Sequence, residues 1–382
     1  MSERNLLMIP GPIEFEPSVL RALGEKTRSH LDPVFMKAYG RALKRLREVF
    51  LAPTAQPFVV AGSGTLAMEM AVANLVQPGD KALVVNTGYF SDRLGTMLER
   101  HGATVTHLRA DPGAVPPADE VEVALATGGF KLMTITHVDT STAVLAPVQE
   151  LAAAARKHGV LVVVDGVCSV GGEALEMDAW GVDVAFTASQ KALGTPPGLA
   201  VLLAGPRALA AWKARTRPVA SMYLDFAEWL PVHEAYEAEK PAYFATPPVN
   251  LIMALDVSLG HLVDEGIPAR VQRHVALATS VWAAWEALGL KPLPRSHAVS
   301  AHTLSALFYP GALDAALVKA VAAQGVIVAG GLHPQLKAKY FRVGHMGAVT
   351  RSDLVVTVSA IERALKACGH PVTLGAGVAA LG

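Results

Sequence analysis

The sequence predicts an α/β protein whose larger part is built on a doubly wound, mostly parallel β-sheet, followed by a smaller α+β domain. Short apolar runs rich in valine and bounded by glycine, such as residues 160–164 and 182–188, are typical of strands buried on both faces. These runs alternate with helical patterns, which favours right-handed crossovers. We therefore expect an N-terminal arm (residues 1–16), a large domain (17–257), a small C-terminal domain (258–375) and a tail (376–382).

The prolines near the start predict an extended arm, which we expect to lie across a partner subunit. Residues 18–50 have a helical pattern with a break near Asp32–Pro33. Further helices are expected after the Gly62–Thr65 turn and over residues 91–101 and 148–158, with a polar, proline-rich loop around residues 111–119. The strands expected in the large domain span residues 58–61, 82–86, 132–136, 160–164, 182–188 and 199–203.

The C-terminal part changes character. Residues 212–248 are polar and aromatic, and they are followed by two long helical patterns over residues 250–265 and 269–288. We expect Ser352 to cap the last helix, with Asp353 at its positive end, and the residues after Leu374 to fray. The short strands expected here span residues 304–310, 326–329 and 340–343.

The composition argues against several classes of protein. The 382 residues include 33 Lys+Arg and 33 Asp+Glu, a balance that predicts neither nucleic acid nor an acidic membrane as a partner. The first residues lack a signal-peptide or transit-peptide pattern, and no apolar run reaches the roughly 18 residues that a membrane span needs. Cys168 and Cys368 are far apart and predict neither a disulfide framework nor a metal site, so we expect a cytoplasmic location and no metal.

Asp165 and Lys191 each follow a predicted strand. Because ligands bind beyond the carboxyl ends of parallel strands, we expect both side chains to face one crevice. Pyridoxal phosphate requires such a pair, since a lysine amine forms a Schiff base with it and an acid keeps its ring nitrogen protonated. Only a neutral amine reacts, and burial lowers a lysine pKa from its usual value of about 10.4. Taken alone, a turn-capping Asp and a surface Lys would be the commoner explanation.

The other predicted strands also end in polar or aromatic residues. Gly62–Thr65 begin a helix, where exposed N–H groups bind an anion, although a simple N-cap explains them equally well. Ala67 stands where a dinucleotide-binding fingerprint needs its third glycine. Phe90 could lie flat on a planar cofactor ring or pack in the core. With His137–Ser141 included, five strand ends in succession carry such groups, which favours a ligand site.

The chain resembles the class V aminotransferases, which have fold type I and use pyridoxal phosphate. The motifs IPGPIEF, AGSGT, NTGYF, THVDTSTA, VVVDGVCSVG, TASQKA and YFATP carry this resemblance in order along almost the whole chain. The resemblance is strongest to the alanine–glyoxylate enzymes of fungal type and to the serine–pyruvate enzymes. It implies that Lys191 is the catalytic residue, which holds the cofactor and moves protons, and that Asp165 pairs with the ring nitrogen. The other implied cofactor contacts are Ser63, Gly64, Thr65 and Gln190 at the phosphate, Phe90 and Val167 at the ring faces, and Thr140 at the phenolic oxygen.

The resemblance also implies a homodimer with shared active sites, because Tyr243 and Thr246 match residues that reach the phosphate of the neighbouring subunit. Arg342 matches the arginine that binds the substrate α-carboxylate, a role that suits the two-point contact of a guanidinium. Gly11 would line a pocket for a small side chain. The chain departs from its relatives where Phe90 replaces a common tryptophan and Ala143 a common glycine.

We expect transamination of a small L-amino acid, alanine or serine, with glyoxylate or pyruvate by a ping-pong mechanism. Aspartate, ureidoglycine and 2-aminoethylphosphonate are alternative donors, and for a distal anion Arg28 is the candidate cation. A cysteine desulfurase would need a nucleophilic cysteine on a loop, whereas Cys168 lies on a segment expected to be packed and Cys368 in the last helix. A dinucleotide-dependent oxidoreductase conflicts with Ala67, and a catalytically silent binding module conflicts with the intact Lys–Asp pair.

Overall fold

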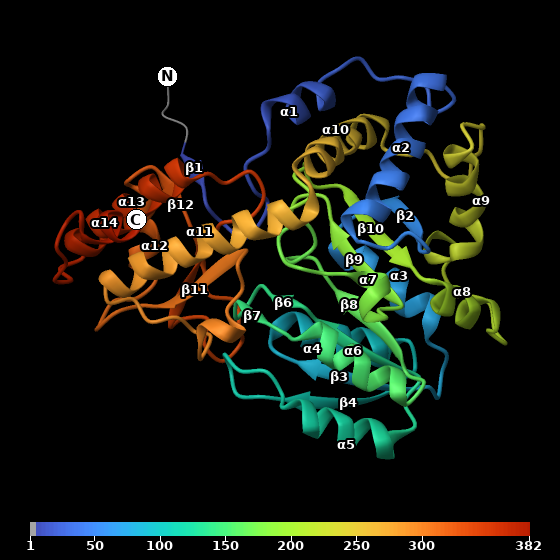
Figure 1. Ribbon diagram of the computed structural model, residues 1–382, viewed down its shortest axis with the longest axis horizontal. Coiled ribbons are helices and arrows are strands. Elements are labelled where there is room, and N and C mark those ends of the chain that lie inside the picture. The colour runs from blue at the N-terminus through green and yellow to red at the C-terminus, as the bar shows by residue number, and fades with distance from the viewer. Residues whose placement is uncertain (1–4) are drawn as a thin grey trace.

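A seven-stranded β-sheet forms the centre of the computed structural model, which describes residues 5–382 (Figure 1). The strands lie in the order β2-β10-β9-β8-β5-β3-β4, and β10 is antiparallel to both neighbours while the others share one direction. The predicted doubly wound, mostly parallel sheet is confirmed. The strand bounds are β2 (Gln56–Ala61), β3 (Lys81–Asn86), β4 (Thr104–Arg109), β5 (Leu132–Thr136), β8 (Leu161–Asp165), β9 (Val184–Ala188) and β10 (Leu199–Ala204).

Helices cover both faces of this sheet, and successive strand residues point to opposite faces. Leu83 and Val85 belong to one apolar core, whereas Ala82 and Val84 belong to another on the opposite face. Burial on both faces explains why these strands read as continuous apolar runs. The helices of this larger part are α1 (Pro17–Leu23), α2 (Pro33–Val49), α3 (Gly64–Leu75), α4 (Tyr89–Arg100), α5 (Ala118–Gly128), α6 (Val148–Lys157), α7 (Met177–Trp180), α8 (Pro206–Lys213), η1 (Met222–Leu224), α9 (Phe226–Glu237) and α10 (Val249–Glu265).

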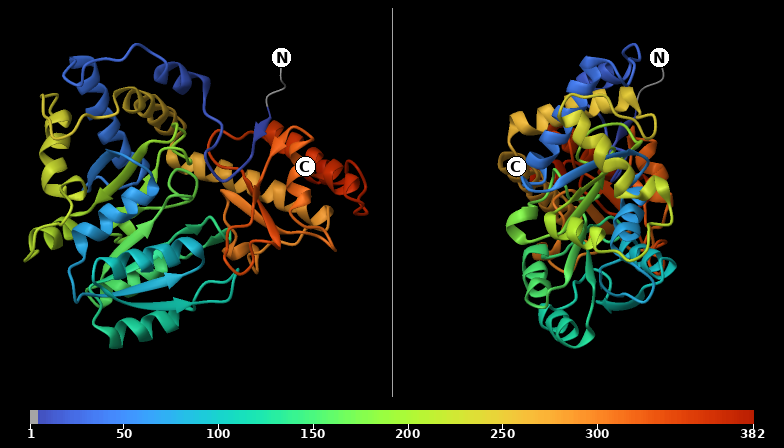
Figure 2. Two further views of the ribbon diagram at one scale, coloured as in Figure 1. Left: turned by 180° about the vertical axis from the view of Figure 1, so that it is seen from behind. Right: turned by 90° about the vertical axis from the view of Figure 1, so that its right-hand side faces the viewer.

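The C-terminal residues form a smaller part with its own core beside the sheet (Figure 2). Its antiparallel sheet has the order β11-β14-β13, with β11 (Leu304–Phe308), β13 (Ala329–Gly330) and β14 (Tyr340–Gly344). The N-terminal arm joins it through β1 (Leu6–Leu7), which pairs in parallel with β12 (Val326–Ile327). The remaining elements are β6 (Val138–Asp139), β7 (Val144–Leu145), α11 (Ile267–Ala287), η2 (His297–Val299), α12 (Ala316–Ala322), α13 (Arg351–Ala367) and α14 (Ala376–Ala380).

Two expected features of the C-terminus are wrong. The N-cap of α13 is Thr350 rather than Ser352, and the Thr350 hydroxyl and the Asp353 carboxylate form a reciprocal capping box. The residues after Leu374 do not fray, because they form α14 and both carboxylate oxygens of Glu362 accept hydrogen bonds from backbone N–H groups there. Leu381 is buried in the same core. The N-cap residue of α14, Gly375, has no side chain, and the Glu362 carboxylate on α13 accepts the hydrogen bonds of the first backbone N–H groups instead.

Three other differences concern element bounds. The expected helix over residues 18–50 is interrupted earlier and for longer, since α1 ends at Leu23 and α2 begins at Pro33. Strand β4 and helix α5 were not predicted, because β4 is an edge strand with a partly exposed pattern and α5 buries only two hydrophobic residues. Residues 326–330 form two short strands in different sheets rather than one strand.

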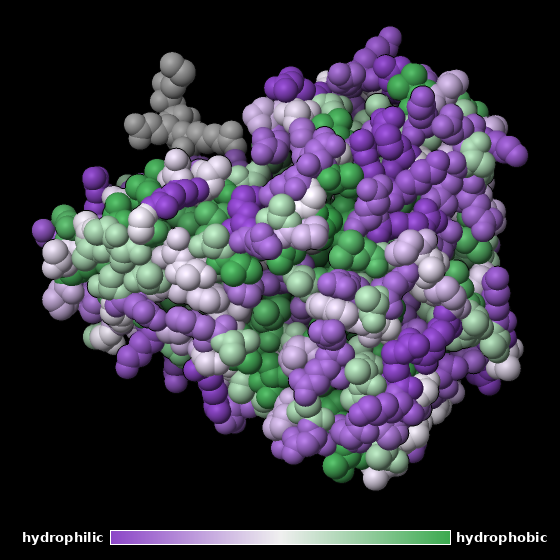
Figure 3. Space-filling view, in the orientation of Figure 1, coloured by the Kyte–Doolittle hydropathy of each residue, from purple (hydrophilic) through white to green (hydrophobic). Residues whose placement is uncertain are grey.

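The surface in the view of Figure 3 is mostly hydrophilic over α2 and α9 and more hydrophobic along the junction between the two parts. A cleft of about 520 Å³ lies at this junction, lined by Val271 and Val275 of α11 and by Val148 of α6. Within residues 5–382, no helix has the length and apolar character required to cross a bilayer.

Candidate active site

Four neighbouring strands bring the predicted site residues to one edge of the sheet. β9, β8, β5 and β3 lie side by side in this order and run in the same direction, so their carboxyl ends meet. Lys191 follows β9, Asp165 ends β8, Asp139–Ser141 follow β5, and Phe90 follows β3 in the first turn of α4. Such an edge is where ligands bind in open α/β sheets.

Lys191 lies in a turn between β9 and β10 and is 9% exposed. Its Nζ donates a hydrogen bond to the carbonyl of Pro10 in the N-terminal arm. Gly11 has a φ of +120°, and a Cβ atom at this position would lie 2.6 Å from Lys191 Nζ. Only glycine fits there, because any side chain would take the space of the lysine. The arm thus covers the lysine amine directly.

The Asp165 carboxyl is 2% exposed and lies beneath the same edge. Its Oδ1 accepts a hydrogen bond from the backbone N–H of Val167 at 3.0 Å. The pKa of Asp165 is raised to about 7, chiefly by burial and also by the nearby Asp139. The Val167 hydrogen bond and the charges of Lys191 and Arg93 lower this pKa and offset part of the rise. A buried carboxyl in this state is stabilised by a cationic partner such as a protonated ring nitrogen.

Asp139 and Ser141 hold the segment that carries Phe90. The Asp139 carboxylate accepts hydrogen bonds from the backbone N–H groups of Phe90 at 3.2 Å and Ser91 at 3.4 Å. The Ser141 hydroxyl donates to the same carboxylate at 2.6 Å and accepts from the N–H of Tyr89 at 3.0 Å. These contacts fix the backbone of residues 89–91 at the site edge. Asp139 and Ser141 are absent from the set of site residues predicted from the sequence, although their position after β5 was recognised.

Arg93 is a second residue that the sequence did not reveal. Its guanidinium carbon lies 5.1 Å from the Phe90 ring centroid, and Nη1 donates to the Thr65 hydroxyl at 3.1 Å. It therefore joins the expected phosphate turn to the aromatic residue, with a cation–π contact on the ring. The sequence offered one indication of this contact, because Arg93 follows Phe90 by three residues in α4 and side chains at this spacing lie on the same face of a helix.

Arg342 on β14 comes from the smaller part and reaches the same edge. Its Nη1 donates to the Thr140 carbonyl at 3.1 Å and its Nε to the Gly330 carbonyl at 2.9 Å. Burial lowers the pKa of Arg342. The Thr140 hydroxyl lies 2.6 Å from the sulfur of Cys168, which is buried. The structure thus joins Arg342 and Thr140 across the two parts, and Cys168 is not on an exposed loop.

The expected phosphate turn begins α3. Ser63 is the N-cap residue, but its side chain makes no capping hydrogen bond. A Cβ atom at Gly64 would lie 3.0 Å from Val167 Cγ2 and 3.2 Å from Ala188 Cβ, so this backbone packs tightly against the site. The side-chain amide oxygen of Gln190 is buried without a hydrogen-bond partner. Helix N–H groups and the Ser63 hydroxyl are donors that suit a phosphate group, whereas the unpaired Gln190 oxygen is itself an acceptor.

Tyr243 and Thr246 do not join this cluster within the chain. Tyr243 is 63% exposed, and its hydroxyl lies 3.4 Å from that of Thr246. The Tyr243 ring centroid is 5.4 Å from that of His30. Across residues 5–382, none of the hydrogen bonds connects either residue to Ser63, Thr65 or Gln190.

The residues at this edge therefore fit pyridoxal phosphate. Lys191 supplies a buried amine, Asp165 a buried carboxyl in need of a cation, and Phe90 and Val167 supply apolar surfaces. The α3 turn offers donors for the phosphate.

The sequence pattern of the aminotransferase class V family matches residues 18–358. The chain belongs to the class V aminotransferases. Alanine–glyoxylate aminotransferase 1 of Saccharomyces cerevisiae is 39% identical over 356 residues, covering 89% of this chain and 91% of the relative. L-aspartate–glyoxylate aminotransferase of Paracoccus denitrificans is 34% identical, covering 100% of this chain and 96% of the relative.

A solved class V aminotransferase structure confirms the architecture. Ureidoglycine–glyoxylate aminotransferase of Bacillus subtilis matches with a TM-score of 0.93 and 25% identity, covering 100% of this chain and 98% of that one. Class V aminotransferases have fold type I and depend on pyridoxal phosphate, so the predicted fold and cofactor are confirmed.

Proposed function

We propose that this class V aminotransferase transfers the amino group of a small L-amino acid, alanine or serine, to glyoxylate by a ping-pong mechanism. The convergence of Lys191, Asp165 and Arg342 from separate elements at one sheet edge is the observation that carries this proposal. Glyoxylate is favoured as the acceptor because three related proteins, although they differ in amino donor, all have glyoxylate in their names. Pyruvate remains the alternative acceptor.

Each residue has a distinct task in this proposal. When bound, pyridoxal phosphate supplies a ring that accepts electrons from the substrate α-carbon. Asp165 keeps a proton on the ring nitrogen, because its carboxylate and the cation stabilise each other in a buried place. Lys191 would anchor the cofactor, and its Nζ would take the proton from the substrate α-carbon and deliver it to the cofactor carbon. Ser63, Gly64, Thr65 and Gln190 bind the phosphate, Phe90 and Val167 enclose the ring, and Thr140 approaches the phenolic oxygen.

Arg342 binds the α-carboxylate of the substrate. Two of its nitrogen atoms, Nε and Nη1, are held by backbone carbonyls, which fixes the plane of the guanidinium. The orientation of the carboxylate then decides which α-carbon bond stands perpendicular to the ring.

The donor side chain is small because Gly11 and the arm lie against Lys191. Arg28, the candidate cation for a distal anion, is paired with Asp32 at 3.4 Å near the start of α2. This placement supports alanine or serine over aspartate or 2-aminoethylphosphonate.

We further propose a homodimer in which Tyr243 and Thr246 of one subunit complete the phosphate site of the other. Exposed Met222 and Tyr223 support this, since the Tyr223 hydroxyl donates to the Ala61 carbonyl beside the phosphate turn at 3.3 Å. Such an apolar rim next to a site suits a second copy of the chain. A cytoplasmic location agrees with two unpaired cysteines.

A half-reaction tests the proposal. The protein is loaded with pyridoxal phosphate, and the absorbance of the bound cofactor is followed after addition of L-alanine, L-serine, L-aspartate or 2-aminoethylphosphonate without an acceptor. We expect loss of the band with alanine or serine and its return with glyoxylate. Loss with aspartate or the phosphonate alone would overturn the small-donor assignment. Failure of all donors, or of glyoxylate to restore the band, would overturn transamination to glyoxylate.

A further inference from the structure

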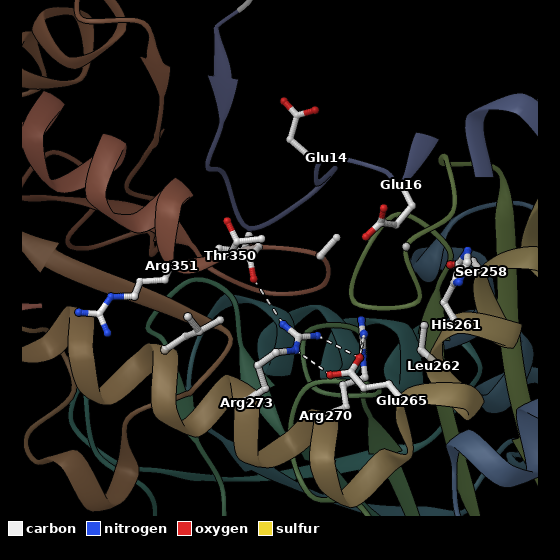
Figure 4. Close-up of a pocket in the computed structure, with 14 residues that line it drawn as sticks. Glu14, Glu16, Ser258, His261, Leu262, Glu265, Arg270, Arg273, Thr350 and Arg351 are labelled. Atoms are coloured by element: carbon white, nitrogen blue, oxygen red, sulfur yellow. Dashed lines mark hydrogen bonds and ion pairs between the residues drawn. The ribbon is translucent and has the colours of Figure 1, made fainter. Parts of the chain in front are cut away.

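A charge network lies where the chain passes from α10 to α11. Glu265 ends α10, and Arg270 and Arg273 lie near the start of α11. Glu265 accepts hydrogen bonds from Arg270 Nη1 at 2.7 Å and from Arg273 Nε at 2.6 Å. Figure 4 shows the carboxylate between the two guanidinium groups, beside a cleft of about 610 Å³. Burial raises the pKa of Glu265, but the two arginines outweigh it and leave this pKa below its usual value.

Arg270 connects this network to the turn that carries Lys191. Its side chain is almost fully buried, and Nη2 donates to the carbonyl of Ala192, the residue after Lys191, at 3.0 Å. Its Nε donates to the carbonyl of Gly171, in the segment that follows Asp165, at 2.8 Å. A planar guanidinium with three fixed acceptors holds their relative positions. Arg270 therefore holds the backbone next to Lys191 and the turn at Gly171, six residues after Asp165.

Arg273 and His274 connect the network to the loop after β14, the strand of Arg342. Arg273 Nη2 donates to the Gly347 carbonyl at 3.1 Å, and the Gly347 N–H donates to His274 Nε2 at 3.0 Å. The His274 Nδ1–H donates to the Arg270 carbonyl at 2.8 Å. Burial, together with the Arg270 charge, lowers the pKa of His274 to about 3, so the ring stays neutral, as acceptance at Nε2 requires.

We propose that Glu265, Arg270 and Arg273 are positioning residues that keep the Lys191 turn and the Arg342 strand in register. This rests on the proposed function, in which the lysine amine and the guanidinium act on one substrate molecule. The two groups come from different sheets, and a misplacement of about 1 Å can cost on the order of 100-fold in rate. The Glu265 carboxylate accepts hydrogen bonds from both arginines. Because Arg270 holds the Lys191 turn and Arg273 holds the loop after β14, this carboxylate fixes the distance between the two segments.

Arg273→Gln is the informative change, because it removes the guanidinium hydrogen bonds to the carbonyls of Gly347 and Val349 and leaves only the His274 contact to this loop. The Glu265–Arg270 pair meanwhile keeps the buried charge neutralised. Arg351→Gln is the matched control, since Arg351 lines the same cleft but points away from Glu265 in Figure 4. Hydrogen exchange of the cofactor-loaded proteins is compared for residues 189–198 and 345–350. We expect Arg273→Gln to accelerate exchange at least about threefold in both segments, and Arg351→Gln in neither. Acceleration confined to residues 345–350, or none, would overturn the link.

A double-mutant cycle tests the consequence for catalysis. Arg342→Gln is placed in the parent and in Arg273→Gln, and kcat/KM for the amino donor is measured. We expect the fold-loss in kcat/KM of the double variant to differ by more than about threefold from the product of the two single losses. For independent sites the two values agree within about twofold. For the control pair, Arg342→Gln with Arg351→Gln, the fold-loss in kcat/KM should equal the product of the two single losses. If the losses from Arg342→Gln and Arg273→Gln also multiply as independent effects, the positioning role is overturned. An inactive parent would instead overturn the proposed function, and the exchange experiment would still decide whether the network links the two segments.

Discussion

At the scale of single residues, the Asp165 carboxyl makes stability depend on pH. Burial raises its pKa from 3.8 to about 7, so the folded protein binds this proton more tightly than the unfolded chain. Without cofactor, the stability contributed by Asp165 is fully present below pH 4 and declines as the pH rises toward 7. Its loss amounts to a few kcal/mol, at about 1.4 kcal/mol per pKa unit.

Asp165→Asn should therefore stabilise the cofactor-free protein at pH 8 by a few kcal/mol, and hardly at all at pH 4, while it weakens cofactor binding. Urea unfolding at the two pH values measures the difference. The exposed Asp264→Asn change is the control, with no comparable gain at pH 8. A variant that is no more stable than the parent at pH 8 would contradict the assigned burial.

Lys191→Ala should abolish covalent retention of the cofactor. Borohydride reduction of the loaded parent should leave pyridoxyl label on the peptide that contains Lys191, because reduction fixes the lysine linkage. The variant should carry none after denaturation, as measured by mass. Lys213→Ala, at the exposed end of α8, should label like the parent. Covalent label in Lys191→Ala would show that another amine holds the cofactor.

The placement of Lys191 and Asp165 at one sheet edge could be predicted because Lys191 follows the buried strand β9, Asp165 ends the buried strand β8, and the ends of neighbouring parallel strands meet. The contact of Gly11 with Lys191 could not be predicted from spacing, since 180 residues separate them and the arm reaches the lysine only in the folded chain. Arg93 and Asp139 were missed for a related reason. Their importance lies in partners on other elements, and only the folded structure supplies those partners.

At the scale of elements, the N-terminus of α13 offers a direct comparison of two neighbouring residues. Thr350→Ala removes the side chain that accepts the Asp353 N–H, and we expect a loss of about 1 kcal/mol in the free energy of unfolding. Ser352→Ala, two residues further on, should change it by less than about 0.5 kcal/mol. Chemical denaturation measures both, and equal losses would argue against the assigned cap.

The success of element prediction followed burial. Strands β5, β8 and β9 are buried along their length, and β3 is buried after its exposed first residue, Lys81, so their apolar runs were clear. The edge strand β4 instead has only exposed and half-buried residues. Helix α14 was missed because the Glu362 carboxylate that supports it lies on another helix. Local sequence carries no signal for such a contact.

At the scale of the whole molecule, the proposed dimer makes each active site depend on two chains. Lys191→Ala and Tyr243→Ala should each be weakly active alone. In a hybrid dimer, one site receives both wild-type residues and the other receives both substitutions. Random mixing of unfolded chains followed by refolding should therefore restore about a quarter of the parent activity. Mixing Lys191→Ala with Arg342→Gln, which lies on the same chain's site, should restore none. Equal results for the two mixtures would contradict shared sites.

The pairing of β1 with β12 also determines when the N-terminal arm can take its final position during synthesis of the chain. The arm leaves the ribosome long before the strand that receives it, because β1 and β12 are far apart along the chain. Until then the residues just before Pro10 and Gly11, which cover the lysine amine, lack their pairing partner. The last strand of the central sheet, β10, is made well before β12, so the sheet can form before the cover over the reactive nitrogen closes. Translation itself thus delays the formation of a complete aldehyde-capturing pocket until β12 has been made.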